Sequence, residues 1–131
     1  MFPSRFDALG RVVEFLEAFC HEAGIEREQC LRINLVLEEL FTNTVKHGHR
    51  GESDAPVWVC LDREPSRLRL TYEDTAPPFN PYAQVDAGFD STPLEHRKIG
   101  GLGVFITREM AAAFDYAYLF GRNRVELSLP A

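Results

Sequence analysis

LVLEELFTNTVKHGHR, residues 35–50, is the stretch that decides the fold. Apolar side chains recur in and just before it at intervals of three and four residues, which is the spacing of a buried helix face. The residues of this face are Ile33, Val36, Leu37, Leu40, Phe41, Thr44 and Val45. Glycines at positions 48 and 51 end the pattern. The sequence therefore predicts one amphipathic helix that begins near Glu26–Gln29 and runs into a turn at Gly48.

Three polar residues of this helix, Glu39, Asn43 and His47, follow one another at intervals of four. Each step of four rotates only about 40° around the helix axis, so the three side chains form a single stripe. The stripe lies beside the apolar face rather than opposite it. A carboxylate, an amide and an imidazole in that place indicate a ligand cavity beside the core. The alternative is an ordinary solvated stripe.

Length, composition and charge are those of one globular domain. The chain has 131 residues, of which 45% are hydrophobic and 26% charged, and its net charge is −6. An acidic balance without a basic run argues against a direct nucleic-acid partner. No apolar run approaches the roughly 18 residues that span a membrane, and the first residues lack a signal-peptide pattern. We therefore expect a cytoplasmic protein without a membrane partner.

The three cysteines, Cys20, Cys30 and Cys60, are odd in number and far apart in sequence. Neither a disulfide framework nor a cysteine metal site is indicated by such a pattern.

Apolar periodicity predicts further elements on both sides of the deciding helix. A first helix covers residues 6–23 and ends at Gly24, and a short third helix covers Val104–Ala113. Four strands are expected in two hairpins: Val57–Leu61 with Leu68–Tyr72, and Tyr116–Phe120 with Arg124–Leu129 around a turn at residues 121–123. Strands grouped in hairpins favour a mixed, mostly antiparallel sheet with the helices on one face. The expected class is α+β, a two-layer α/β sandwich.

Between the two hairpins, Tyr82–Ile99 shows no periodicity. A loop of that length is uncommon in a compact domain unless it has a function. It leads into Gly100-Gly101-Leu102-Gly103, where small residues before a helix let backbone N–H groups approach an anion. Together the two segments predict a lid, at about residues 82–100, over a phosphate group. A simple flexible hinge is the alternative.

Asp74 ends the second expected strand and enters a turn with three prolines. Its ionised carboxylate only accepts hydrogen bonds, which suits an exocyclic amine such as that of adenine. The alternative is an Asx-type turn that caps the strand. On the deciding helix, Asn43 offers a neutral oxygen suited to Mg2+. Glu39 could act as a general base on a hydroxyl or water, although Glu38 stands beside it.

These segments together resemble the Bergerat-type ATP site shared by gyrase, heat-shock chaperone, sensor histidine kinase and mismatch-repair ATPases. Glu39–Asn43 with Lys46–Gly48 is similar to the first box of that site, Asp74–Pro81 to the second, and Gly100–Ile106 to the third. Within the superfamily the chain most resembles bacterial anti-sigma factors that are also serine kinases. The signs are its compact length, the Pro-Pro-Phe-Asn-Pro run after Asp74, and the final Gly-Arg-Asn-Arg-Val at residues 121–125.

The resemblance implies one ATP-binding domain over residues 1–131 and assigns roles to three residues. Glu39 would be the catalytic base, Asn43 the Mg2+ ligand, and Asp74 the acceptor of the adenine amine. It also implies further ATP-binding residues: His47, Ala76, Phe79, Arg97, Lys98, Gly100, Gly101, Leu102, Gly103, Val104 and Asn123.

Four of those positions differ from the family pattern or leave a choice open. Arg97 and Lys98 both qualify as the basic lid residue that reaches the terminal phosphate. Ala76 stands where the second box often has glycine, and Asn123 stands where many relatives have a threonine near the adenine.

The function implied by the resemblance is that of an ATP-dependent serine/threonine-protein kinase. It would bind a sigma factor and phosphorylate a serine of an anti-sigma antagonist protein, and a homodimer is compatible with this role. The alternative is a nucleotide-sensing module without phosphotransfer, or the isolated catalytic fragment of a sensor kinase. The intact pair of Glu39 and Asn43 favours catalysis.

Overall fold

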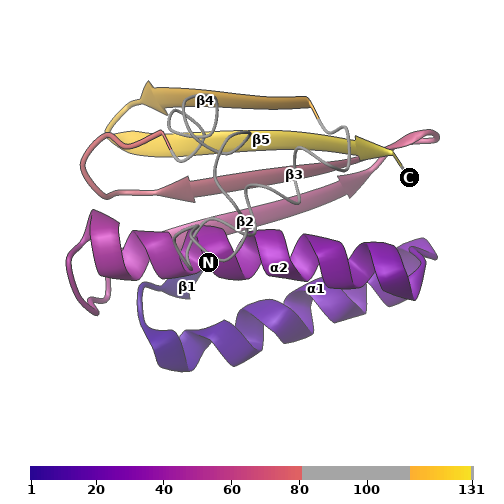
Figure 1. Cartoon of the computed structure of the whole chain (residues 1–131), viewed down its shortest axis with the longest axis horizontal. Coiled ribbons are helices and arrows are strands. Elements are labelled where there is room, and N and C mark those ends of the chain that lie inside the picture. The colour runs from indigo at the N-terminus through magenta and orange to yellow at the C-terminus, as the bar shows by residue number, and fades with distance from the viewer. Residues whose placement is uncertain (81–112, 131) are drawn as a thin grey trace, which may run out of the picture.

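The computed structural model describes residues 1–80 and 113–130. In this part of the chain two α-helices cover one face of a five-stranded sheet (Figure 1). The strand order is β1-β2-β3-β5-β4, and the described strands pair only in the antiparallel sense. The predicted two-layer α+β architecture is therefore confirmed.

The described residues form five strands, two α-helices and two short helical turns next to the α-helices. The strands are β1 (Phe2–Pro3), β2 (Pro56–Arg63), β3 (Arg67–Asp74), β4 (Ala113–Leu119) and β5 (Arg122–Pro130). The helices are α1 (Leu9–Ala23), preceded by the 3-10 turn η1 (Phe6–Ala8), and α2 (Arg27–Asn43), followed by the π-helical turn η2 (Thr44–Gly48). None of the helices described in residues 1–80 and 113–130 has the length and apolar character needed to cross a lipid bilayer.

Predicted boundaries around β4 and β5 are wrong. Ala113, expected to end a helix, is the first residue of β4. Arg122 and Asn123, expected in the last hairpin turn, are the first residues of β5, so only Phe120 and Gly121 connect the two strands. The remainder of that helix and the loop with its glycine run, residues 82–112, lie outside the described residues.

The core lies between the helices and the inner face of the sheet. The apolar residues of the predicted α2 face are at most 4% exposed, and Thr44 is buried among them. Inward positions alternate along β3, so Leu68, Leu70, Tyr72 and Asp74 all point toward α2. This alternation brings the carboxylate of Asp74 under the end of the deciding helix.

The α-helical pattern of the deciding segment stops at Asn43 rather than continuing to Gly48. In η2 the N–H of His49 donates to the carbonyl of Thr44 at 2.9 Å, which is a five-residue step. Such wide turns are frequently found at functional sites. The change of pitch also ends the predicted stripe after Asn43, and the side chain of His47 is exposed.

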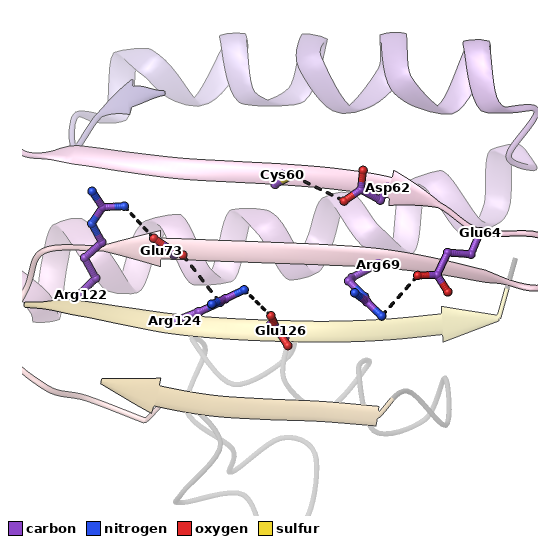
Figure 2. Close-up of polar contacts among 8 residues, drawn as sticks. All are labelled: Cys60, Asp62, Glu64, Arg69, Glu73, Arg122, Arg124 and Glu126. Atoms are coloured by element: carbon purple, nitrogen blue, oxygen red, sulfur yellow. Dashed lines mark hydrogen bonds and ion pairs between the residues drawn. The ribbon is translucent and has the colours of Figure 1, made fainter. Parts of the chain in front are cut away.

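The opposite face of the sheet carries charged side chains that pair with one another. Figure 2 shows Glu73 of β3 between Arg122 and Arg124 of β5, with N···O distances of 3.0 and 3.7 Å. Arg124 also contacts Glu126 at 2.6 Å. Exposed ion pairs of this kind contribute at most about 1 kcal/mol each, so they mark the solvated side of the sheet rather than a second core.

Candidate functional site

A pocket opens where the end of α2 meets the ends of β3 and β5. It encloses about 360 Å³ of empty space, part of it open to solvent. Leu40, Val125 and Phe79 line it with apolar surface, whereas Asn43 and Asp74 line it with polar groups.

Asp74 is only 7% exposed and accepts three hydrogen bonds. Its Oδ2 accepts from the hydroxyl of Thr44 at 2.7 Å, and its Oδ1 accepts from Nδ2 of Asn123 at 2.8 Å. The third donor is the backbone N–H of Ala76, at 3.1 Å from Oδ1. This last bond is an Asx turn, so the strand-capping reading of Asp74 is correct, and the same carboxylate also lines the pocket.

Asn123 ties β5 to the turn that follows Asp74. Besides Asp74, its Nδ2 donates to the carbonyls of Ala76 and Pro77 at 2.9 and 3.0 Å. Its Oδ1 accepts from the N–H of Phe79 at 2.9 Å and from the hydroxyl of Tyr116. An amide has two N–H donors and one carbonyl oxygen, so these bonds engage all its polar groups. In this structure the side chain of Asn123, which is only 6% exposed, holds the wall of the pocket.

Gly48 and Ala76 form a close-packed part of the same wall. A Cβ atom added to Gly48 would lie 2.7 Å from the Cβ of Ala76. Ala76 is 2% exposed. The methyl group of Ala76, which replaces the glycine frequent in the second box, therefore occupies space that the glycine at position 48 leaves free.

Glu39 lies one turn before Asn43 on α2 and is half-buried. Burial raises the pKa of its carboxyl, while a hydrogen bond from Asn43 and the positive charge of Lys46 act in the opposite direction. Its Oε1 is buried without a hydrogen-bond partner among the described residues. Glu38, in contrast, accepts a hydrogen bond from Asn34 at 3.3 Å. Because Oε1 of Glu39 has no hydrogen-bond partner there, it could accept a proton from a bound group.

Not all predicted site residues meet in the pocket. Asn43, Asp74, Ala76, Phe79 and Asn123 line it, whereas Glu39 and the exposed His47 do not. The remaining candidates lie outside the described residues: Arg97, Lys98, Gly100, Gly101, Leu102, Gly103 and Val104.

The metal ligands available to the pocket are few. Within residues 1–80 and 113–130, no group of three His, Cys, Asp or Glu side chains could hold a metal ion. A Mg2+ ion here would need oxygens from a bound phosphate in addition to Asn43, which is how Mg2+ commonly binds in proteins.

Two pocket residues were missed as polar site residues by the sequence reasoning, Thr44 and Tyr72. Tyr72 precedes Asp74 by two positions in a strand, so both side chains had to share a face. Thr44 stands on a buried helix face, where its hydroxyl requires a hydrogen-bond partner. Both signals were present in the sequence.

The sequence is similar to a known domain family along most of its length. Residues 2–129 match the family model described as the histidine kinase-like ATPase domain. Serine-protein kinase RsbW of Listeria monocytogenes is 30% identical over 108 residues, which are 76% of this chain and 64% of that protein. RsbW of Listeria innocua is 29% identical over the same shares. The chain thus spans less than two thirds of the length of these relatives.

Solved structures share the fold. The histidine kinase domain of the blue-light activated histidine kinase of Erythrobacter litoralis EL346 superposes with a TM-score of 0.58 at 16% identity, over 98% of this chain and 61% of that one. The catalytic domain of histidine kinase ThkA gives a TM-score of 0.55 at 14% identity, over 93% and 92%. At such identities the likeness concerns the fold alone.

Proposed function

Because this chain belongs to the histidine kinase-like ATPase domain family, we propose that it binds ATP with Mg2+ and transfers the terminal phosphoryl group to a serine of a partner protein. The observation that carries the proposal is the buried carboxylate of Asp74. It lines the pocket together with Asn43, and Glu39 lies one helical turn away.

Three side chains would divide the work. Asp74 would accept a hydrogen bond from the exocyclic amine of adenine, since all its contacts within the protein come from donors. Asn43 would give a neutral oxygen to Mg2+, which when bound neutralises phosphate charge. Glu39 would take the proton of the serine hydroxyl as its oxygen bonds to the terminal phosphorus and the bond to the ADP oxygen breaks.

The partners are proposed from likeness. The Listeria relatives are named serine-protein kinases, which supports a protein serine as the acceptor. The anti-sigma resemblance of the three boxes adds a sigma factor as binding partner and an anti-sigma antagonist as the phosphorylated protein, in the cytoplasm.

Transfer of label tests the proposal. The chain is incubated with γ-labelled ATP, Mg2+ and a candidate antagonist, and we expect label on a serine of the antagonist. If the wild-type chain binds ATP but neither labels protein nor hydrolyses ATP, the kinase reading fails and a nucleotide-sensing module replaces it.

Binding itself is tested by calorimetry with Asp74→Asn, which keeps an oxygen for the turn but presents an N–H donor on the other side. The loss of a charged hydrogen bond, about 1.5–3 kcal/mol, predicts ATP affinity about 10- to 150-fold weaker. Asp62→Asn, on an exposed part of β2, is the matched control and should bind ATP as the wild type does. Equal affinity of all three proteins would remove Asp74 from the site.

A further inference from the structure

The hydrogen bonds to the carboxylate of Asp74 show how many of its acceptor sites remain free for a ligand. Two carboxylate oxygens offer about four lone-pair sites. Asn123 and the N–H of Ala76 fill both sites on Oδ1, and Thr44 fills one on Oδ2. One acceptor site therefore remains, on Oδ2, the oxygen that Thr44 contacts.

The direction of the bonds around Thr44 follows from its single proton. The hydroxyl of Thr44 lies 2.6 Å from the hydroxyl of Tyr72, 2.7 Å from Asp74 Oδ2 and 3.0 Å from the carbonyl of Leu40. Either hydroxyl of the first pair could be the donor. Tyr72 is only 3% exposed, and within the described part of the chain its hydroxyl pairs with Thr44 alone.

If Thr44 donated its proton to Tyr72, the phenolic proton of Tyr72 would be buried without an acceptor, at a cost of about 1–3 kcal/mol. The opposite order satisfies every group: Tyr72 donates to Thr44, and Thr44 donates to Asp74. Burial also raises the pKa of Tyr72 well above its usual value, so its proton is retained at neutral pH. Between the two acceptors within reach of Thr44, the charged carboxylate is favoured over the carbonyl of Leu40.

We infer that Tyr72 and Thr44 form a directed hydrogen-bond pair that positions Asp74 and makes the pocket select a 6-aminopurine nucleotide over a 6-oxopurine nucleotide. The inference rests on the proposed ATP binding and names two positioning residues for it. Thr44 holds Oδ2 in place, and Tyr72 leaves the proton of Thr44 available for that bond. The remaining lone pair of Oδ2 then attracts an N–H group and repels a carbonyl oxygen.

Three triphosphates distinguish this role from a structural one: ATP, ITP with a 6-oxo group, and purine riboside triphosphate with hydrogen at position 6. Thr44→Val removes the hydroxyl at nearly constant shape. We expect ATP affinity to fall about 3- to 10-fold, as for one hydrogen bond, while affinity for purine riboside triphosphate changes less than about twofold. The preference for ATP over both analogues should therefore narrow, and Thr44→Ser, which keeps the hydroxyl, should restore it.

Tyr72→Phe provides a second variant that does not depend on the fold tolerating Val at position 44. Tyr72→Phe should also lower the ratio of ATP affinity to analogue affinity, but by a smaller factor than Thr44→Val does. Added to Thr44→Val, it should change the preference no further, because Tyr72 acts only through Thr44. Thermal unfolding of each variant verifies that the folded state is being compared.

The outcomes separate the two proposals. If Thr44→Val or Tyr72→Phe weakens ATP and purine riboside triphosphate by the same factor, the pair is merely structural and the inference is wrong, although ATP binding stands. Unchanged ATP preference in both variants overturns it as well. If the wild-type chain binds none of the three triphosphates, the proposed function itself fails and the inference falls with it.

Discussion

At the scale of single residues, the burial of Glu39 makes the stability of the folded protein depend on pH. Its pKa is raised from an ordinary value near 4.5, mainly because burial disfavours the charged form. The folded state therefore binds the proton more tightly than the unfolded state does. The stability that this group contributes is complete below pH 4.5 and is lost as the pH rises through the higher pKa of the folded state.

A neutral side chain at position 39 should remove that loss. Urea unfolding of Glu39→Gln at a series of pH values should give the same free energy of unfolding as wild type at low pH and a higher one at neutral pH. Glu38→Gln, which neutralises the adjacent carboxylate that Asn34 contacts, is the matched control. A difference for Glu39→Gln that is constant with pH would contradict the burial of its charge.

The same variants separate catalysis from binding. If Glu39 is the base, Glu39→Gln should keep ATP affinity but lower the rate of phosphotransfer by about 10²–10⁴-fold, the usual range for general-base assistance. Labelled-phosphate transfer under saturating ATP measures this. Glu38→Gln should retain the wild-type rate, and equal losses in both variants would assign the effect to the helix rather than to one carboxylate.

Gly48 and Ala76 give a test of packing that involves no charge. Gly48→Ala should lower the free energy of unfolding by about 1–3 kcal/mol, because the new methyl group overlaps that of Ala76 at 2.7 Å. The double variant with Ala76→Gly should recover most of the loss, and thermal or urea unfolding measures both. If the two changes simply add, the close contact does not exist in solution.

At the scale of elements, the turn between β4 and β5 combines two positive φ angles, 53° at Phe120 and 76° at Gly121. Hairpin turns of this kind favour Asn or Gly at both positions. Phe120 is fully exposed, so within the described residues no side-chain packing compensates its left-handed backbone. The sequence concealed this turn, because phenylalanine carries no turn signal whereas Arg122 and Asn123 looked like turn residues.

Replacing Phe120 by a residue that tolerates a left-handed backbone conformation should stabilise the hairpin. The left-handed conformation costs roughly 1–2 kcal/mol for an ordinary L-residue and less for asparagine, so Phe120→Asn should raise the free energy of unfolding by about 1 kcal/mol. Tyr118→Asn is the control at an exposed position of β4 and should bring no such gain. Loss of stability in Phe120→Asn would mean that the aromatic side chain packs against something in solution.

The helix faces were predictable, because burial against one sheet imposes a regular spacing on α1 and α2. The end of α1 was predictable for a similar reason: Gly24 adopts φ of 69°, a left-handed conformation that favours glycine. The π-helical turn η2 was not predictable, since no residue type signals it. Among the residues that line the pocket, Asp74 and Asn43 were predicted from their chemistry, but the contacts of Asn123 depend on a pairing of β3 with β5 that the local pattern does not contain.

At the scale of the whole molecule, charge restricts the class of partner. The net charge is −6. On the outward face of the sheet, Arg69, Arg122 and Arg124 are each within 4 Å of a glutamate (Figure 2). Basic side chains that are already paired offer little to a phosphate backbone.

Duplex DNA should therefore not bind. An electrophoretic mobility shift assay at moderate salt should show free DNA at every protein concentration, with and without Mg-ATP. A basic DNA-binding domain of similar size serves as positive control. Tight, salt-sensitive binding by this chain would contradict a protein partner as its main target.

The strand order has a consequence for how the protein folds while it is synthesised on the ribosome. β3 pairs with β2 on one side, but its other neighbour is β5, and Asp74 and Asn123 are 49 residues apart. At about 5–20 residues per second, a growing chain carries β3 as an open edge for roughly 2–10 s before β5 is synthesised. Open strand edges pair readily with other chains, so the growing chain is most prone to aggregate during this interval. The contact of Asn123 with Asp74 marks its end.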